Sequence, residues 1–177
     1  GYTLLFQTTT LPGYPVFQKE VPFDVQKDFA PVSLFVEGTF ALVAAKDTPF
    51  ANFKELVAYA KANPGTLNYS ATGPGALMMN VESIKQQFGL DIQQVAYKGA
   101  AASYTAVLSG EVQVAMPDIG RAVEDAAVGN IKILGVSGET RAQLASDVPT
   151  LSELGAEGVR GYWLGLFAKA GTPEAII

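Results

Sequence analysis

Residues 67–77 read LNYSATGPGAL, and the order of residue types in this stretch indicates the fold class of the chain. A short apolar run ends in small and hydroxyl-bearing residues, Ser70 to Gly75, and a helical pattern follows. A strand, a tight turn and a helix produce this order. The first N–H groups of a helix have no intrahelical partner and carry partial positive charge. The stretch therefore predicts either a plain strand-to-helix turn or a place where backbone amides bind an anion.

Two further loops of small residues follow apolar runs downstream. Lys98, Gly99 and Ala100 separate the apolar run 92–97 from a helical pattern, and residues 117–120, which include Asp118, follow the run 112–116. Strands that alternate with helices indicate an α/β fold with a largely parallel sheet. Ligands of such sheets bind beyond the carboxyl ends of the strands. We therefore expect all three loops to meet at one edge of the sheet.

The remaining patterns supply the boundaries of the other elements. Asn52 and Glu55 form a capping box that begins a helix, and Gly89 ends the helix that follows residue 75. A second capping box at residues 150–153 predicts a short helix, and residues 11–22 predict an irregular loop. Strands are expected at the start of the chain and at 131–136 and 162–168, and the runs 30–36 and 40–45 are expected to carry the chain from one sheet to another.

Composition excludes several functional classes. The 177 residues include neither His nor Cys, so Ser-His-Asp chemistry, a thiol nucleophile and most zinc sites are absent from this sequence. The net charge is −5 with only 12 Lys and Arg, which argues against a nucleic-acid partner. No apolar run reaches the roughly 18 residues of a membrane span. No catalytic residue, metal or cofactor is predicted.

Several candidate residues have two interpretations. Thr8 and Thr9 end the first strand, where hydroxyls either contact a ligand or bond the local backbone. Lys98 either pairs with a carboxylate or is a solvated surface lysine. Asp118 either binds the amino group of a ligand or caps the helix after it.

The sequence resembles a known family in several phrases that occur in one order. These are DFAPVS at 28–33, ELVAYAKANPG at 55–65, LNY at 67–69, YKG at 97–99, VPT at 148–150 with Glu153 and Gly155, and AKAGTP at 168–173. Together they resemble the extracytoplasmic solute-binding receptors of tripartite tricarboxylate transporters, often called Bug proteins. The resemblance runs along nearly the whole chain.

This resemblance implies a type II periplasmic-binding-protein fold, in which two α/β lobes close on a small carboxylate in the bacterial periplasm. It implies delivery to membrane permease subunits. A receptor of this family is longer, so residues 41–158 are expected to form one nearly complete lobe. Residues 1–40 and 159–177 are expected to be pieces of the other lobe, and such a fragment is expected to self-associate through its apolar strands.

The resemblance also implies which residues touch the ligand. Thr8 and Thr9 match a hydroxyl-bearing strand end, Gly73 and Gly75 match a central loop, and Gly99 and Ala100 match a second anion-binding loop. Where the family usually reads Tyr-Gly-Ser, this chain has Tyr69-Ser70-Ala71, so the hydroxyl has moved by one residue and Ala71 offers backbone contacts only. The candidate ligand-binding residues are Thr8, Thr9, Ser70, Ala71, Thr72, Gly73, Gly75, Lys98, Gly99, Ala100 and Asp118.

Two other functional classes stay open at this point. An enzyme on the same two-lobed fold would use Asp118, Lys98 and Tyr97 as acid–base groups. The effector-sensing domain of a transcription regulator shares the same fold. Turnover of a bound anion would indicate the enzyme, and a DNA-binding domain upstream in the gene would indicate the regulator.

Overall fold

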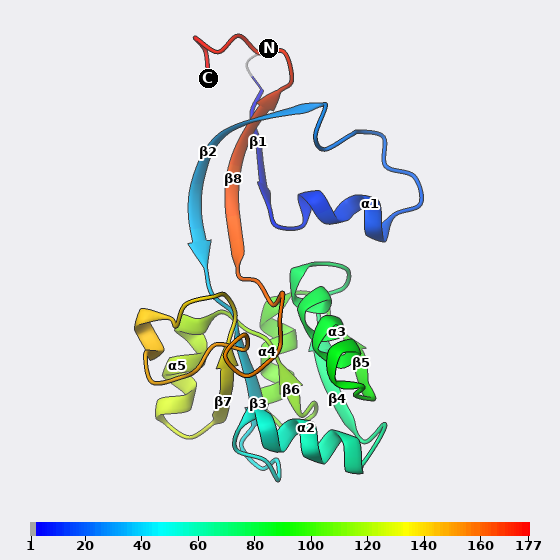
Figure 1. Cartoon of the computed structure of the whole chain (residues 1–177), viewed down its shortest axis with the longest axis vertical. Helices are drawn as coiled ribbons and strands as arrows, with labels where there is room; N and C mark the ends of the chain where they lie inside the picture. The colour runs from blue at the N-terminus through cyan, green and yellow to red at the C-terminus, as the bar shows by residue number, and fades with distance from the viewer. Residues whose placement is uncertain (1–2) are drawn as a thin grey trace. The chain divides into compact units, whose positions relative to one another are not determined.

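The computed structural model describes residues 3–177, and the chain divides into two compact units (Figure 1). Unit 1 comprises the residues up to Gly38 together with Tyr162–Ile177, and unit 2 comprises Thr39–Gly161. The chain therefore leaves unit 1, completes unit 2 and returns to unit 1.

Unit 1 is built on a three-stranded antiparallel sheet with the order β1-β8-β2 (Figure 1). Its strands are β1 (Leu5–Thr8), β2 (Phe29–Gly38) and β8 (Tyr162–Lys169). The segment 11–22 was predicted to be irregular, but it contains a 3-10 turn at Leu11–Gly13 and a one-turn helix, α1 (Tyr14–Phe17). A proline at the second position of each turn, Pro12 and Pro15, fits this geometry, because its fixed φ angle suits a helix start.

Unit 2 contains a five-stranded sheet with the order β5-β4-β6-β3-β7. The strands are β3 (Ala41–Ala45), β4 (Leu67–Ala71), β5 (Ile92–Ala96), β6 (Val114–Ala115) and β7 (Ile131–Val136). Strand β4 pairs in parallel with β5 and β6, whereas β3 runs antiparallel between β6 and β7. The prediction of a largely parallel α/β sheet is therefore confirmed, with β3 as the strand that runs against the others. The predicted passage from one sheet to another is also confirmed, since β2 and β3 belong to different sheets.

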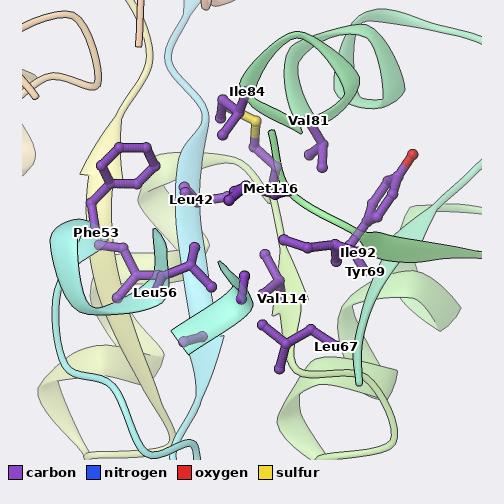
Figure 2. Packing of buried hydrophobic residues seen from close by; sticks show 14 of the residues in the cluster. Leu42, Phe53, Leu56, Leu67, Tyr69, Val81, Ile84, Ile92, Val114 and Met116 are labelled. Atoms are coloured by element: carbon purple, nitrogen blue, oxygen red, sulfur yellow. The ribbon is translucent and has the colours of Figure 1, made fainter. Parts of the chain in front are cut away.

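Helices cover both faces of this sheet and make two separate cores. The helices are α2 (Phe53–Ala62), α3 (Ala76–Phe88), α4 (Ala100–Leu108) and α5 (Ile119–Ala127), and a 3-10 turn lies at Gln143–Ala145. One core joins α2 and α3 to side chains such as Leu42, Tyr69 and Ile92, and Figure 2 shows this packing. The other core joins α4 and α5 to the opposite face, through residues such as Val43 and Val107. Unit 2 is thus a three-layer sandwich.

The helix ends follow the signals in the sequence. Asn52 accepts a hydrogen bond from the Glu55 N–H at 3.0 Å, and a Glu55 carboxylate oxygen accepts from the Ala51 N–H at 2.8 Å. Helix α3 ends at Gly89, whose φ of 65° is left-handed. The predicted capping box and the predicted stop are both confirmed.

The predicted helix after Thr150 is wrong. Thr150 does accept a hydrogen bond from the Glu153 N–H, at 3.0 Å, but the chain forms turns there. Thr150 bridges to Val136 of β7, and the Leu151 N–H donates to the Val136 carbonyl at 2.7 Å. Because the sheet edge takes these backbone groups, no helix develops.

Candidate functional site

The loops after β4 and β5 begin side by side at the carboxyl end of the unit 2 sheet. Ala71 is the last residue of β4 and pairs with Ala96, the last residue of β5. One residue later, the Tyr97 N–H donates to the Ala71 carbonyl at 2.8 Å. The loops at 72–75 and 97–99 therefore begin next to each other at the same edge of the sheet, as the sequence predicted for neighbouring parallel strands.

Both loops lead into helices that begin without a side-chain cap. Gly75 is the N-cap of α3 and Gly99 is the N-cap of α4, and neither start receives a side-chain hydrogen bond within residues 3–177. Gly99 has a φ of 100°, which other residues rarely adopt, and a Cβ built there would meet nothing within 4 Å. The first-turn amides of α3 and α4 are therefore available to an anion.

The side chains of β4 point alternately to the two faces of the sheet. Tyr69 and Ala71 belong to the core with α2 and α3. Ser70 points to the other face, together with its pairing partner Val95, which packs against the core formed by α4 and α5. Ser70 is only 4% exposed, and its Oγ has no hydrogen-bond partner among the described residues.

Of the other candidates in unit 2, Thr72 and Gly73 lie in the first loop, and Ala100 begins α4. Lys98 is exposed in the second loop. Asp118 is the N-cap of α5 and accepts a hydrogen bond from the Gly120 N–H at 2.9 Å. The capping interpretation of Asp118 is therefore correct.

Thr8 and Thr9 lie at the end of β1 in unit 1. The hydroxyls of Thr8 and Thr10 are 2.5 Å apart, and Thr8 Oγ1 accepts from the Thr10 N–H at 3.2 Å. Thr8 thus makes the local backbone contact that was one of its two interpretations. Thr9 is half-buried beside it.

Two of the three acid–base groups of the enzyme alternative, Tyr97 and Asp118, make hydrogen bonds within the structure. Tyr97 Oη donates to a Glu111 carboxylate oxygen at 2.7 Å, and this hydrogen bond raises the pKa of Tyr97. Asp118 caps α5. Among the described residues, no three His, Cys, Asp or Glu side chains gather in the manner of a metal site. No helix within residues 3–177 has the length and apolar character needed to cross a membrane.

A polar network behind the first loop was not predicted. Tyr69 Oη donates to Glu82 Oε1 at 2.7 Å, with Gln94 Oε1 3.2 Å away, and Lys85 Nζ lies 2.6 Å from the same Glu82 oxygen. Figure 2 shows the Tyr69 hydroxyl directed away from the other labelled side chains. The network ties β4 to α3 and β5, and so fixes where the loop at 72–75 begins. The spacing of Glu82 and Lys85 on one helix face was the available sequence signal.

Comparison with known proteins supplies the family. The whole chain, residues 1–177, matches the family described as "Tripartite tricarboxylate transporter family receptor". A UPF0065 protein of Bordetella pertussis is 33% identical over 184 residues, which cover 100% of this chain and 55% of that protein. The chain therefore spans about half the length of the curated relatives it matches.

Solved structures agree with the fold. The R. palustris protein Rpa4515, determined with adipate, is similar with a TM-score of 0.85 and 26% identity, over 99% of this chain and 60% of that one. MatC from Rhodopseudomonas palustris, with bound malate, has a TM-score of 0.83 and 27% identity, over 98% of this chain and 60% of that one. The fold is therefore that of periplasmic binding proteins. On the match along its entire length, the chain belongs to the receptor family of tripartite tricarboxylate transporters.

Proposed function

We propose that the protein is a periplasmic solute-binding receptor that captures a small organic acid for a tripartite tricarboxylate transporter. The observation that carries this proposal is the pair of uncapped helix starts, at α3 and α4, which follow adjacent parallel strands. Aligned amides at these positions favour an anion without any reactive side chain. The acids bound by the two similar proteins, adipate and malate, are both dicarboxylates.

Main-chain groups are proposed to carry most of the binding free energy. A hydrogen bond to a charged group contributes about 1.5–3 kcal/mol, and one carboxylate can accept several. An exposed ion pair contributes about 0–1 kcal/mol, and Lys98 is exposed. The amides of residues 72, 73, 75 and 76 and of residues 100–102 are therefore expected to contribute more than the Lys98 ammonium group.

Calorimetry on the full-length protein tests this function. The ligands are malate, adipate, succinate and citrate, and at least one is expected to bind with micromolar affinity, about −8 kcal/mol. The Lys98→Ala variant is expected to lose less than about tenfold in affinity. A ligand-free protein that binds none of the four acids would contradict the proposal.

The proposed partners are the membrane permease subunits of the transporter, with a periplasmic location. The carboxylate is captured reversibly and released unchanged, since family and fold are those of substrate-binding proteins. A receptor of this kind should bind the same permease only in its liganded state. Co-purification with the permease in the presence and absence of ligand measures this.

We also propose that the 177-residue chain, when produced alone, associates with a second copy through unit 1. Five apolar side chains in or directly next to its sheet are 42–58% exposed. They are Leu4, Phe6, Leu34, Phe35 and Val36. Such surfaces are usually covered by protein. Light scattering should show a dimer or larger species, and the double change Leu34→Ser with Phe35→Ser should restore a monomer; an unaltered chain that is already monomeric would disprove the association.

A further inference from the structure

Two carboxamide side chains of α3 bind the backbone of one later segment of unit 2. Asn80 Nδ2 donates to the Arg160 carbonyl at 2.7 Å, and Asn80 Oδ1 accepts from the Arg160 N–H at 3.2 Å. Nearer the end of α3, Gln87 Nε2 donates to the Glu157 carbonyl at 2.8 Å, and Gln87 Oε1 accepts from the Glu157 N–H at 2.9 Å. A carboxamide carries an acceptor oxygen and N–H donors, so it can pair with the backbone of a residue as a neighbouring strand would.

The segment that these side chains hold, residues 156–160, is called the return segment because it leads through Gly161 into β8 and unit 1. It is neither helix nor strand. Ala156 and Val159 lie in the same apolar core as Val81 of α3. The return segment is therefore fixed to α3 by packing, and side chains of α3 take the place of a sheet partner for its backbone.

The two contacts differ in burial and in their distance from the start of α3. Asn80 is 6% exposed, whereas Gln87 is exposed. Asn80 lies about one turn after Ala76, the first residue of α3, and Gln87 directly precedes Phe88, the last residue. Hydrogen bonds in a buried place are the more costly to lose, because water does not replace them. Asn80 therefore holds the end of α3 that follows the loop at 72–75, and Gln87 holds the opposite end.

We propose that the Asn80–Arg160 pairing couples anion binding at the start of α3 to the return segment. The inference rests on the proposed function and makes Asn80 a positioning residue, because its carboxamide is occupied by the backbone of Arg160 and acts on the ligand only through the helix. Such coupling is reciprocal. The ligand should therefore stabilise the Asn80–Arg160 pairing by the same factor by which that pairing raises the affinity, and a residue that serves folding alone would show no such equality.

Residue-resolved amide hydrogen exchange of the full-length protein measures one side of this coupling. Exchange is compared without ligand and with a saturating concentration of the best-binding acid among malate, adipate, succinate and citrate. The bound acid should slow exchange of the Arg160 amide by about fivefold or more, and that of the Glu157 amide by less. An Arg160 amide whose exchange does not respond to a bound acid would overturn the inference. Equal slowing at both amides would also overturn it, because the ligand would then act on the fold as a whole.

Calorimetry on two full-length variants measures the other side. Asn80→Leu removes both hydrogen bonds at a similar side-chain size, and it should weaken binding of the same acid by the factor found in exchange at Arg160, to within about threefold. Gln87→Leu is the matched control, because it removes the same kind of pairing at the far end of α3, and its affinity should stay within about twofold of the unaltered protein. Similar losses of affinity in the two variants would contradict the role of Asn80.

The outcomes separate the inference from the proposed function. The exchange measurement on the unaltered protein decides the inference even where Asn80→Leu fails to fold. An unaltered protein that binds an acid without any response at Arg160 would keep the receptor function and exclude the coupling. An unaltered protein that binds none of the four acids would contradict the proposed function itself.

Discussion

Asp118 had two predicted roles, ligand contact and helix capping, and the structure shows it capping α5. The Asp118 carboxylate accepts a hydrogen bond from the Gly120 N–H. That hydrogen bond begins α5, a helix that packs on the same sheet face as α4. Asp118 thus supports the helical layer that also contains α4, which follows one of the two loops proposed to bind the anion.

We expect Asp118→Ala to lower the free energy of unfolding by about 1 kcal/mol, the usual cost of losing a helix cap. Asp118→Asn keeps a capping oxygen and should stay within a few tenths of a kcal/mol of the unaltered protein, in line with the near-equal ranking of Asn and Asp as caps. Urea denaturation followed by circular dichroism measures both. Equal loss in the two variants would show that the charge, and not the cap, is what matters.

Individual residues were predictable where their effect is local. The caps at Asn52 and Gly89 depend on neighbours within a few positions, and both were read correctly. The helix predicted after Thr150 was wrong because the backbone of Thr150 pairs with Val136, a residue outside the local sequence pattern. The burial of Ser70 likewise depends on α4, which covers its face of the sheet and is about thirty residues later in the sequence, so no local pattern predicts it.

In the proposed site, the two loops would bind an anion through the backbone amides of the helices that follow them. An uncapped helix start leaves donors in place, whereas a capped start, as in α5, uses them. The contrast among α3, α4 and α5 distinguishes helix starts suited to ligands from a helix start that serves the fold.

A change at the start of α4 should therefore lower the carboxylate affinity by more than the loss of folding stability accounts for. Gly99→Ala places a side chain at a φ of 100°, and we expect a loss of about 1–3 kcal/mol of stability from backbone strain. Carboxylate affinity should fall as well, because the first-turn amides shift. Denaturation and calorimetry on the same samples give both quantities.

Gly89→Ala is the control for this change. Gly89 has a φ of 65°, also in open space, but it ends α3 and lies away from the carboxyl edge of the sheet. It should cost stability and leave the affinity unchanged. Parallel losses of affinity in both variants would indicate general destabilisation.

The network that joins β4 to α3 predicts a pH dependence. Burial alone would raise the pKa of Glu82, but hydrogen bonds from Lys85 and Tyr69 outweigh this effect and leave the pKa of Glu82 lowered. The contribution to stability is therefore complete above the pKa of the unfolded chain, about 4.3 for Glu, and is lost as the pH falls below it. Denaturation at a series of pH values from about 6 down to about 3 should show a smaller decline for Glu82→Gln than for the unaltered protein, and identical declines would exclude this role.

On the scale of the whole chain, the two units differ in how much core they possess. Both apolar clusters lie within unit 2, whereas the buried apolar residues of unit 1 in the described chain are Leu11 and Ala168. The α/β class of unit 2 was predictable because hydrophobic periodicity reports it directly. The sheet of unit 1 was harder to predict, since β8 pairs with strands more than a hundred residues earlier in the chain.

Hydrogen exchange measured by mass spectrometry should reflect this difference. Amides of β3 and β4 are expected to exchange slowly, at rates set by global unfolding, because a buried core surrounds them. Amides of β1 and β2 should exchange faster in the 177-residue chain. Equal protection of the two sheets would mean that unit 1 has a stabilising partner that this chain alone does not display.

The central claim is that backbone amides at the starts of α3 and α4 hold the carboxylate. A crystal structure of the full-length protein with its tightest-binding acid tests this most directly. The account predicts carboxylate oxygens about 3 Å from amide nitrogens of residues 72, 73, 75 and 76 and of residues 100–102. A carboxylate held by side chains alone, or bound away from both helix starts, would contradict it.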